Sequence, residues 1–177
     1  MRLRRATADD LDGLDEVFAG ARQEMLTYIA RLHTREEDRG FLRDLVATTE
    51  LWVAEVDERV VGFVALEGDL LAHIYTHPQG DGSGSALIDK AKERRPGGFH
   101  LWVFQRNEGA RRFYERHGLR LVELTDGAGN EQRLPDARYE WRASAALSPA
   151  RARAPRARGS SGRSRGAGSR SSPRRSP

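Results

Sequence analysis

A glycine-rich segment near the middle of the chain has the residues needed to bind a phosphate group. Residues 79–85 read Gln-Gly-Asp-Gly-Ser-Gly-Ser and precede an amphipathic run that contains Leu87, Ile88 and Ala91. Glycines at alternate positions allow tight turns in which successive N–H groups point the same way. The start of a helix adds free N–H groups and the positive end of its dipole. We therefore expect this segment to bind a phosphate or a pyrophosphate.

Two other kinds of phosphate-binding loop fit this segment poorly. A P-loop requires a lysine directly before the serine or threonine of its helix, but Gly84 precedes Ser85. A dinucleotide fingerprint requires Gly-x-Gly-x-x-Gly, whereas the glycines here are Gly80, Gly82 and Gly84 and follow the strands of a hairpin. A glycine-rich turn without a ligand is the remaining alternative.

A second segment, residues 107–118, combines a helical pattern with a group suited to proton transfer. Ala110, Phe113, Tyr114 and His117 recur at a spacing that places them on one face of a helix. Phe113 is expected to be a core residue. Tyr114 has a hydroxyl that needs a partner when it is buried, and such a phenol is suited to give a proton to a leaving thiolate.

Alternating strand and helix patterns predict the elements that must position these two segments. The helices begin at Thr7, at the capping box of Thr34 and Glu37, after the glycine-rich segment, and at Asn107. The resulting order, β-α-α-β-β-β-α-β-α-β-β, predicts an α/β fold with a mixed sheet and helices on both of its faces. The predicted strands are residues 2–6, 51–56, 60–66, 70–76, 99–104, 119–124 and 137–142.

Composition excludes several classes of protein. The chain has 177 residues and no cysteine, which excludes disulfides, thiolate nucleophiles and zinc bound by cysteine. No apolar run approaches the roughly 18 residues that a membrane span needs, and we expect no signal peptide after Met1. We therefore expect a cytoplasmic protein without a membrane partner, and we predict no metal site.

Charge divides the chain into two parts. Residues 143–177 contain nine of the 30 basic residues and no acid, so residues 1–142 have 21 basic and 26 acidic side chains, a net charge of −5. The tail uses only Ala, Ser, Pro, Gly, Arg and one Leu, which cannot bury enough apolar surface to offset the entropy of ordering. We predict a folded domain over 1–142 and a disordered tail over 143–177. The arginines of the tail could bind nucleic-acid phosphates. The tail has no aromatic residue to stack on bases, which weakens this interpretation. The alternative is a solvated tail without a partner, or the product of a shifted reading frame.

Taken together, the two segments resemble the signature motifs of the GNAT superfamily of N-acetyltransferases. Residues 79–84 are similar to the acyl-CoA pyrophosphate loop of that family, and residues 107–118 resemble its second motif, Asn-x-x-Ala-x-x-Phe-Tyr-x-x-x-Gly. The resemblance covers residues 2–142 and includes the order of the elements. It implies the GNAT fold and transfer of an acetyl group from acetyl-CoA, the co-substrate, to a primary amine of a small molecule or peptide. Since no cysteine can carry the acyl group, we expect direct attack in a ternary complex.

The resemblance also implies roles for individual residues. The backbone of Ile74, Tyr75 and Thr76 would bind the pantetheine arm as an added strand, and the Tyr75 amide would polarise the thioester carbonyl. Tyr114 would be the general acid for the coenzyme A thiolate. The pyrophosphate would be held by Gln79, Gly80, Asp81, Gly82, Ser83, Gly84 and Ser85. The remaining cofactor contacts would come from Asn107, Ala110 and Phe113.

The base that takes a proton from the amine has several candidates. His73 lies on the strand beside the expected thioester position, shares a strand face with the Tyr75 side chain, and is of a type that titrates near neutral pH. A packed or surface histidine is the alternative. Glu67 and Asp69, at the preceding turn, could act through water. Further polar residues that could line the acceptor pocket are Glu24, Tyr28, His33, Glu131, Arg133 and Asp136.

Two features depart from the family pattern. Pro78 directly precedes Gln79, where the family has a short spacer, and Asp81 stands where the family commonly has Arg or Lys. A carboxylate that faces a pyrophosphate weakens its binding. A degenerate or non-catalytic acyl-CoA-binding protein is therefore the second hypothesis, and a nucleic-acid-associated protein acting through the tail is the third. The sequence leaves open the acceptor, the length of the acyl group, and whether the protein is a monomer or a homodimer.

Overall fold

A computed structural model describes residues 1–25 and 32–143 of the chain. The predictions for Tyr28 and for the tail beyond residue 143 lie outside these described residues. Within the described part, no helix is both long and apolar enough to cross a bilayer.

Seven strands form one mixed sheet, as the sequence predicts. Their order across the sheet is β1-β2-β3-β4-β5-β7-β6, and every neighbouring pair is antiparallel except β4 and β5, which are parallel. The strands are β1 Arg2–Arg5, β2 Glu50–Val56, β3 Arg59–Glu67, β4 Leu70–Thr76, β5 Phe99–Phe104, β6 Arg120–Leu124 and β7 Asp136–Trp141. The helices are η1 Ala8–Asp10, a short 3-10 turn, then α1 Leu11–Met25, α2 Arg35–Thr48, α3 Ser83–Arg94 and α4 Glu108–Arg116.

Two of the helices begin at side chains that the sequence identifies as caps. The Thr34 hydroxyl accepts the Glu37 N–H at 3.2 Å, and the Glu37 carboxylate accepts the Thr34 N–H at 2.7 Å, so α2 opens with a complete capping box. At the start of α4, Asn107 Oδ1 accepts the Ala110 N–H at 3.1 Å. Both caps satisfy N–H groups that have no partner inside their helix.

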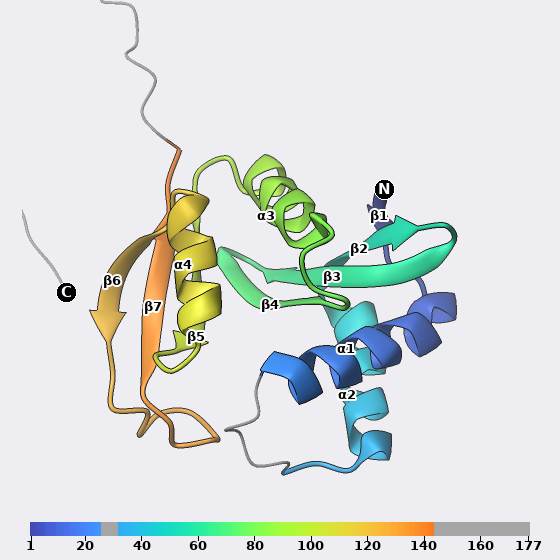
Figure 1. Cartoon of the computed structure of the whole chain (residues 1–177), viewed down its shortest axis with the longest axis horizontal. Coiled ribbons are helices and arrows are strands. Elements are labelled where there is room, and N and C mark those ends of the chain that lie inside the picture. Colours follow the sequence, from blue (N-terminus) through green and yellow to red (C-terminus); the bar gives the residue numbers. More distant parts are fainter. Residues whose placement is uncertain (26–31, 144–177) are drawn as a thin grey trace, which may run out of the picture. The chain divides into compact units, whose positions relative to one another are not determined.

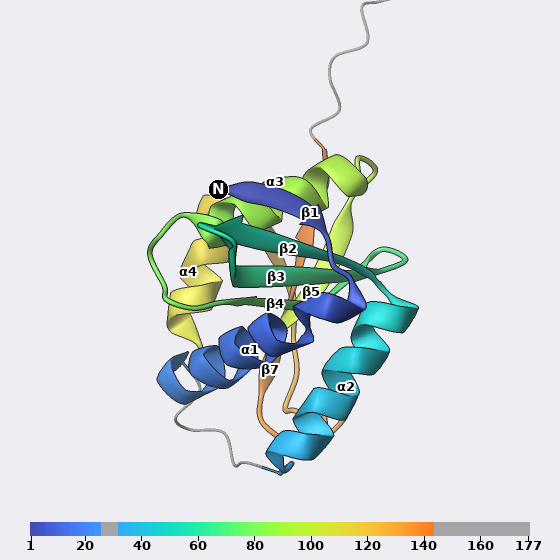
Figure 2. The ribbon, with the colours of Figure 1, turned by 90° about the vertical axis from the view of Figure 1, so that its right-hand side faces the viewer.

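Side chains of β3 alternate between the two faces of the sheet, and each face is covered by different helices. Val64 and Leu66 belong to a buried cluster with Leu87, Ile88 and Ala91 of α3. Phe63 and Ala65 point the other way and pack with residues of α1 and α2. Figure 2 shows α1 and α2 on one face of the sheet and α3 on the other. The prediction of helices on both faces is therefore confirmed.

The parallel neighbours β4 and β5 are paired at one end only. Leu70 and His100 form their register pair, and the His100 N–H donates to the Asp69 carbonyl at 2.9 Å. Beyond this point the two strands diverge (Figure 1). On their other edges β4 stays paired with β3 as far as Thr76, and β5 stays paired with β7 as far as Phe104. Two open backbone edges therefore face each other across a gap in the sheet.

An ion-pair cluster fixes α2 against α1. The Asp15 carboxylate, only 2% exposed, accepts from Arg35 at 2.8 Å and from Arg39 at 3.3 Å. Without these arginines the buried Asp15 carboxylate would be left without a partner, which is unfavourable. The two helices are therefore held in a defined arrangement beside β4.

Candidate functional site

The gap between β4 and β5 contains a cavity of about 250 Å³. His73, Ile74 and Tyr75 contribute from β4, and Tyr114 and Asn107 contribute from the second predicted segment. The fold thus brings together predicted residues from two elements, β4 and α4. The remaining lining residues are Leu71, Ala72, Leu101, Trp102, Val103, Phe104, Ala110, Asn130 and Asp136.

The register of β4 decides which of its backbone groups face this cavity. The His77 N–H donates to the Val61 carbonyl of β3 at 2.9 Å. In an antiparallel ladder, every second residue of a strand bonds the same neighbour, so the Tyr75 amide is also directed to β3. The amides of Ile74 and Thr76 point to the gap instead. The prediction that the Tyr75 amide polarises a carbonyl in the gap is therefore wrong, and Ile74 has the amide in the suitable direction.

The glycine-rich segment ends in the N-terminus of α3, as predicted. Gly80 and Gly82 have φ angles of 89° and 88°, a region that favours glycine. The Ala86 N–H donates to the Gly82 carbonyl at 3.1 Å and forms the first turn of the helix. The N–H groups of Gly84 and Ser85, which precede it, have no carbonyl partner in the described structure. They are suited to bind an anion.

Asp81 points into this helix start and not away from it. Its Oδ1 accepts the Ser83 N–H at 2.8 Å and the Ser83 hydroxyl at 2.5 Å. Ser83 is fully buried, and its N–H and its hydroxyl both donate to Asp81. A carboxylate therefore takes one of the N–H groups that the sequence assigned to the pyrophosphate.

Gly84 connects the gap in the sheet with the start of α3. A Cβ atom added to Gly84 would lie 3.8 Å from Thr76 Cγ2 and 3.3 Å from the Phe113 ring. Glycine therefore keeps the end of β4, the start of α3 and the α4 aromatic ring close together. Phe113 packs partly buried against the core and is not among the residues that line the gap cavity. The contact of Phe113 with the cofactor stays a prediction, and the ring lies beside Gly84 at the start of α3.

Ser85 has a partner that the sequence did not suggest. The Ser85 hydroxyl lies 3.0 Å from His117 Nε2, and His117 Nδ1 lies 2.8 Å from the Phe113 carbonyl. The histidine at the end of α4 therefore reaches the first turn of α3. This contact couples the two predicted motifs, which are far apart in the sequence.

Tyr114 is one of two tyrosines that line the gap cavity, the other being Tyr75. Tyr114 is 7% exposed, and its ring lies 5.5 Å from Phe113 and 6.1 Å from Tyr139, measured between ring centroids. Burial, with a smaller contribution from the charge of Tyr75, raises the pKa of Tyr114 above its ordinary value of 10. The hydroxyl therefore stays protonated at neutral pH and acts as a hydrogen-bond donor.

His73 lies where the gap cavity meets a second, larger cavity of about 640 Å³. Its ring packs edge-on against Phe41 at 5.1 Å and stacks with Tyr75 at 6.4 Å, so the predicted shared face with Tyr75 is confirmed. Burial lowers the pKa of His73 to about 4. The imidazole is therefore neutral near pH 7 and is a weak base.

The loop between β6 and β7 closes one end of both cavities. The Asp136 carboxylate accepts from the Thr125 hydroxyl and from Asn130 Nδ2, the latter at 2.9 Å. Asn130 also bonds the Leu134 backbone through both ends of its amide, at 2.8 and 3.2 Å. Gly127, with a φ of 82°, lies so close that an added Cβ would fall 2.2 Å from the Leu134 carbonyl oxygen. The loop is thus internally bonded and holds Asn130 at the junction of the cavities.

The other polar candidates divide between the cavities and the far end of the sheet. Asp136 lines the gap cavity, and His33 and Glu131 line the larger one, where they contact each other at 3.0 Å. Glu67 and Asp69 lie at the closed end of the gap and line neither cavity, so they are not placed to act on a substrate there. Arg133 also lines neither cavity. The side chain of Glu24, like Tyr28, lies outside the described part of the structure.

Several cavity residues were not identified from the sequence as functional. Phe18 and Phe41 fit the apolar faces of two helices, and Asp38 and Asp44 fit the polar face of α2. Helical periodicity alone gives no sign that one face borders a cavity, because that depends on how α1 and α2 are placed over β4. Asn130 carried a weak signal, since it follows Gly127 and Gly129 in a polar loop.

Comparison with known proteins gives this geometry a family. The family model of an acetyltransferase (GNAT) domain matches residues 47–120, which include the open edge of β4, the start of α3 and the whole of α4. An uncharacterized N-acetyltransferase of Archaeoglobus fulgidus is 31% identical over 151 residues, covering 74% of this chain and 100% of that protein. The chain belongs to the GNAT family of acetyltransferases.

Two further proteins are similar to this GNAT acetyltransferase. The peptidyl-lysine N-acetyltransferase YiaC of Escherichia coli is 33% identical over 101 residues, covering 54% of this chain and 66% of YiaC. The PaiA N-acetyltransferase of Thermoplasma acidophilum, solved in complex with coenzyme A, has a TM-score of 0.66 and 19% identity, covering 80% of this chain and 98% of that one. The predicted GNAT fold and acyltransferase class are therefore confirmed.

Proposed function

We propose that this GNAT acetyltransferase transfers an acetyl group from acetyl-CoA to a primary amine by direct attack in a ternary complex. The observation that carries the proposal is the open edge of β4 in a cavity that Tyr114 also lines, together with the free amides of α3 at Gly84, which lies next to Thr76 at the end of that strand. We assign this activity to a domain of residues 1–142. A C–N bond forms, the thioester C–S bond breaks, the amine loses one proton and the sulfur gains one.

The backbone of β4 binds the substrate thioester arm in this proposal. The Ile74 and Thr76 amides face the gap and are free to pair with an amide-containing chain as a neighbouring strand would. The Ile74 amide is then the donor that stabilises negative charge on the thioester oxygen. At the other end, the Gly84 and Ser85 amides bind the pyrophosphate at the positive end of α3.

Tyr114 stabilises the departing sulfur. Tyr114 lines the cavity, and its hydroxyl stays protonated because burial raises the pKa of the phenol. A thiol has an ordinary pKa of about 8.5, so full transfer of a proton from a weaker acid is uphill. The raised pKa therefore favours a hydrogen bond from Tyr114 to the thiolate as the first event, with the proton following.

His73 orients the attacking amine. The neutral imidazole at the junction of the cavities can accept a hydrogen bond from an amine N–H. Since burial holds the pKa of His73 at about 4, this ring is a poor final acceptor for the proton of an ammonium group. The larger cavity is lined by carboxylates, including Asp44 and Glu131, and provides a polar route for the proton to solvent.

The test is the release of free thiol from acetyl-CoA in the presence of primary amines. Tyr114→Phe should lower kcat while the purified protein still binds coenzyme A. Tyr139→Phe is the matched control, because Tyr139 is also a buried tyrosine but bonds Glu115 at 2.7 Å and does not line the cavity. The proposal fails if no amine produces thiol above the rate of spontaneous hydrolysis, or if both variants lose activity equally.

A further inference from the structure

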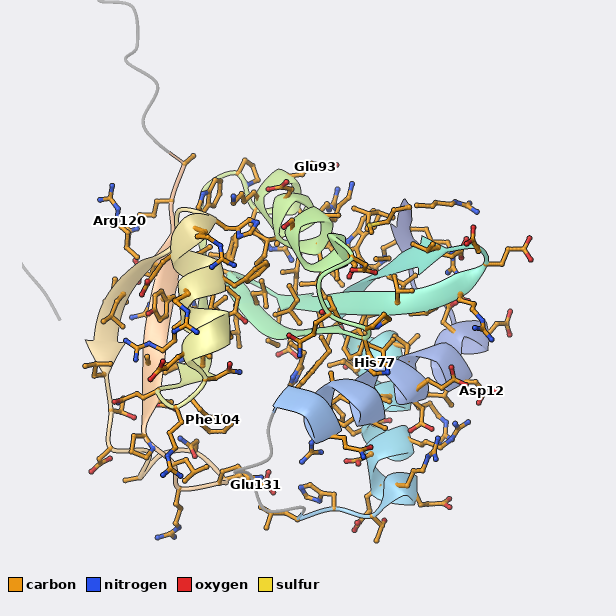
Figure 3. The ribbon with its side chains drawn as sticks, in the orientation of Figure 1. Asp12, His77, Glu93, Phe104, Arg120 and Glu131 are labelled. Carbon is orange, nitrogen blue, oxygen red and sulfur yellow. The ribbon has the colours of Figure 1, made fainter. Side chains whose placement is uncertain are left out.

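The larger cavity, next to the gap, has the size of a pocket for a small molecule. Its volume is about 640 Å³, within the range of about 300–1,000 Å³ that such pockets occupy. It shares His73, Tyr75, Phe104 and Asn130 with the gap cavity, so an amine seated in it reaches the place where the thioester is expected. Figure 3 shows Phe104 at the end of β5 and Glu131 on the loop beyond it. The side chains that line this cavity are therefore the ones that an acceptor amine would contact.

Aromatic rings from three elements form one side of the cavity. Phe18 of α1 lies 5.0 Å from Tyr75 and 5.9 Å from Phe41 of α2, and Phe41 lies 5.1 Å from His73. Phe41 remains 38% exposed, although burial of a phenylalanine ring is favourable. This surface suits the apolar stem of a ligand and not a polar backbone.

The described cations of the cavity are already paired with carboxylates. Arg22 contacts Asp38 at 3.2 Å and also lies over the Phe18 ring at 5.1 Å. His33 contacts Glu131 at 3.0 Å. No described cation of the cavity is therefore left to bind a carboxylate or phosphate of a ligand.

Two carboxylates of the cavity, Glu37 and Asp44, form no salt bridge among the described residues, and the charge of His33 is only the weakest of the influences on Glu37. Hydrogen bonds from the Thr34 backbone and hydroxyl hold the pKa of Glu37 below its ordinary value, so it is ionised at neutral pH. Glu37 comes four residues before Phe41 and Asp44 three residues after it, which places all three on one face of α2. The exposed Phe41 ring thus lies between two negative charges.

We infer that the acceptor is a small aliphatic diamine, an inference that rests on the proposed acetyl transfer. One amine lies at the junction beside His73, the stem packs on Phe41, and the second amine, as an ammonium, pairs with one of the two carboxylates that flank this ring, Glu37 or Asp44. An amine with a carboxylate at the far end would meet uncompensated negative charge in the same place. An uncharged far end would leave these carboxylates without a ligand partner.

Three amines with the same stem test this assignment. Cadaverine carries a second ammonium, pentylamine ends in a methyl group, and δ-aminovalerate ends in a carboxylate. One exposed charge pair with the second ammonium favours cadaverine over pentylamine by up to about fivefold in kcat/KM. The value for δ-aminovalerate falls below that for pentylamine, and added salt reduces both differences.

Variants locate the preference in the cavity. The double variant Glu37→Gln and Asp44→Asn should bring cadaverine and pentylamine to within about twofold of each other. Glutamine keeps an oxygen that can accept the Thr34 N–H, so the start of α2 is preserved. Glu36→Gln is the matched control, since Glu36 is in the same helical turn but does not line the cavity, and it should leave the ratio unchanged.

Two results overturn the diamine assignment while leaving acetyl transfer intact. One is thiol release at equal rates with the three amines, or fastest with δ-aminovalerate. The other is a kcat/KM for a basic lysine peptide more than about tenfold above that for cadaverine, which would assign the cavity to a peptide side chain. If no amine releases thiol, the proposed function fails, and the acceptor assignment fails with it.

Discussion

Replacing Asp81 by asparagine removes a negative charge from the start of α3 without removing the bond that shapes the loop. Asp81 Oδ1 accepts the Ser83 N–H at 2.8 Å, and the side-chain amide oxygen of asparagine can accept the same bond. In the proposal, a doubly charged pyrophosphate binds the next amides, those of Gly84 and Ser85. Asp81→Asn should therefore strengthen the binding of coenzyme A.

The size of this effect follows from the distances. Donors on adjacent residues place the carboxylate and the nearest phosphate roughly 4–5 Å apart, where two unit charges in water interact by about 1 kcal/mol. Asp81 is exposed, so the value for water is the appropriate one. Repulsion between the Asp81 carboxylate and a doubly charged group then amounts to about 1–2 kcal/mol, which is about 5–30-fold in Kd.

Isothermal titration of coenzyme A into both proteins at low and high ionic strength measures this effect. The ratio of the two Kd values should shrink as salt is added, because exposed charges are screened. Asp126→Asn is the matched control, since Asp126 Oδ1 accepts the Ala128 N–H at 2.9 Å in the same kind of turn, on the β6–β7 loop. Equal affinities for wild type and Asp81→Asn at low salt, with an unchanged melting temperature, would refute this reasoning.

Three further predictions concern Tyr114, His73 and Gly127. Tyr114→Phe should lower kcat about 100-fold with little change in KM for acetyl-CoA; steady-state kinetics beside Tyr139→Phe check this, and an unchanged kcat would contradict it. Because burial lowers the pKa of His73 to about 4 from an ordinary 6.5, the unfolded chain binds the extra proton first. The free energy of unfolding of the wild type should then fall by about 3 kcal/mol more than that of His73→Phe as the pH falls from 6.5 to 4. Denaturant unfolding at both pH values measures this, and an equal fall for the two proteins would contradict it. Gly127→Ala should cost about 1–3 kcal/mol because its Cβ would clash with the Leu134 carbonyl at a positive φ, whereas Gly129→Ala, with open space around it, should be neutral in thermal unfolding.

Local patterns were sufficient to predict the elements of the fold. The predicted strands Leu70–Thr76 and Phe99–Phe104 agree with the structure at both ends, and α2 and α4 begin at the predicted caps. These features depend on residues that are neighbours in sequence, where turn chemistry and periodicity act directly. The order β5-β7-β6 depends on long-range pairing and was not predicted.

The sequence identified residues that the fold brings together, but not the directions of their backbone groups. The sequence places Ile74, Tyr75 and Thr76 together on a strand, but only the register with β3 decides that the Tyr75 amide faces away from the gap. The low pKa of His73 likewise follows from burial beside Phe41, which the strand pattern alone does not contain. Both properties arise from packing between elements that are distant in the sequence.

The central claim is that the open edge of β4 and the start of α3 together bind acetyl-CoA. Amide chemical shifts of the isotope-labelled protein, followed by NMR as acetyl-CoA is added, test this claim most directly. The account predicts the largest changes at the N–H groups of Ile74, Thr76, Gly84 and Ser85, with a smaller change at Tyr75. Unchanged shifts at these positions at millimolar acetyl-CoA would contradict it.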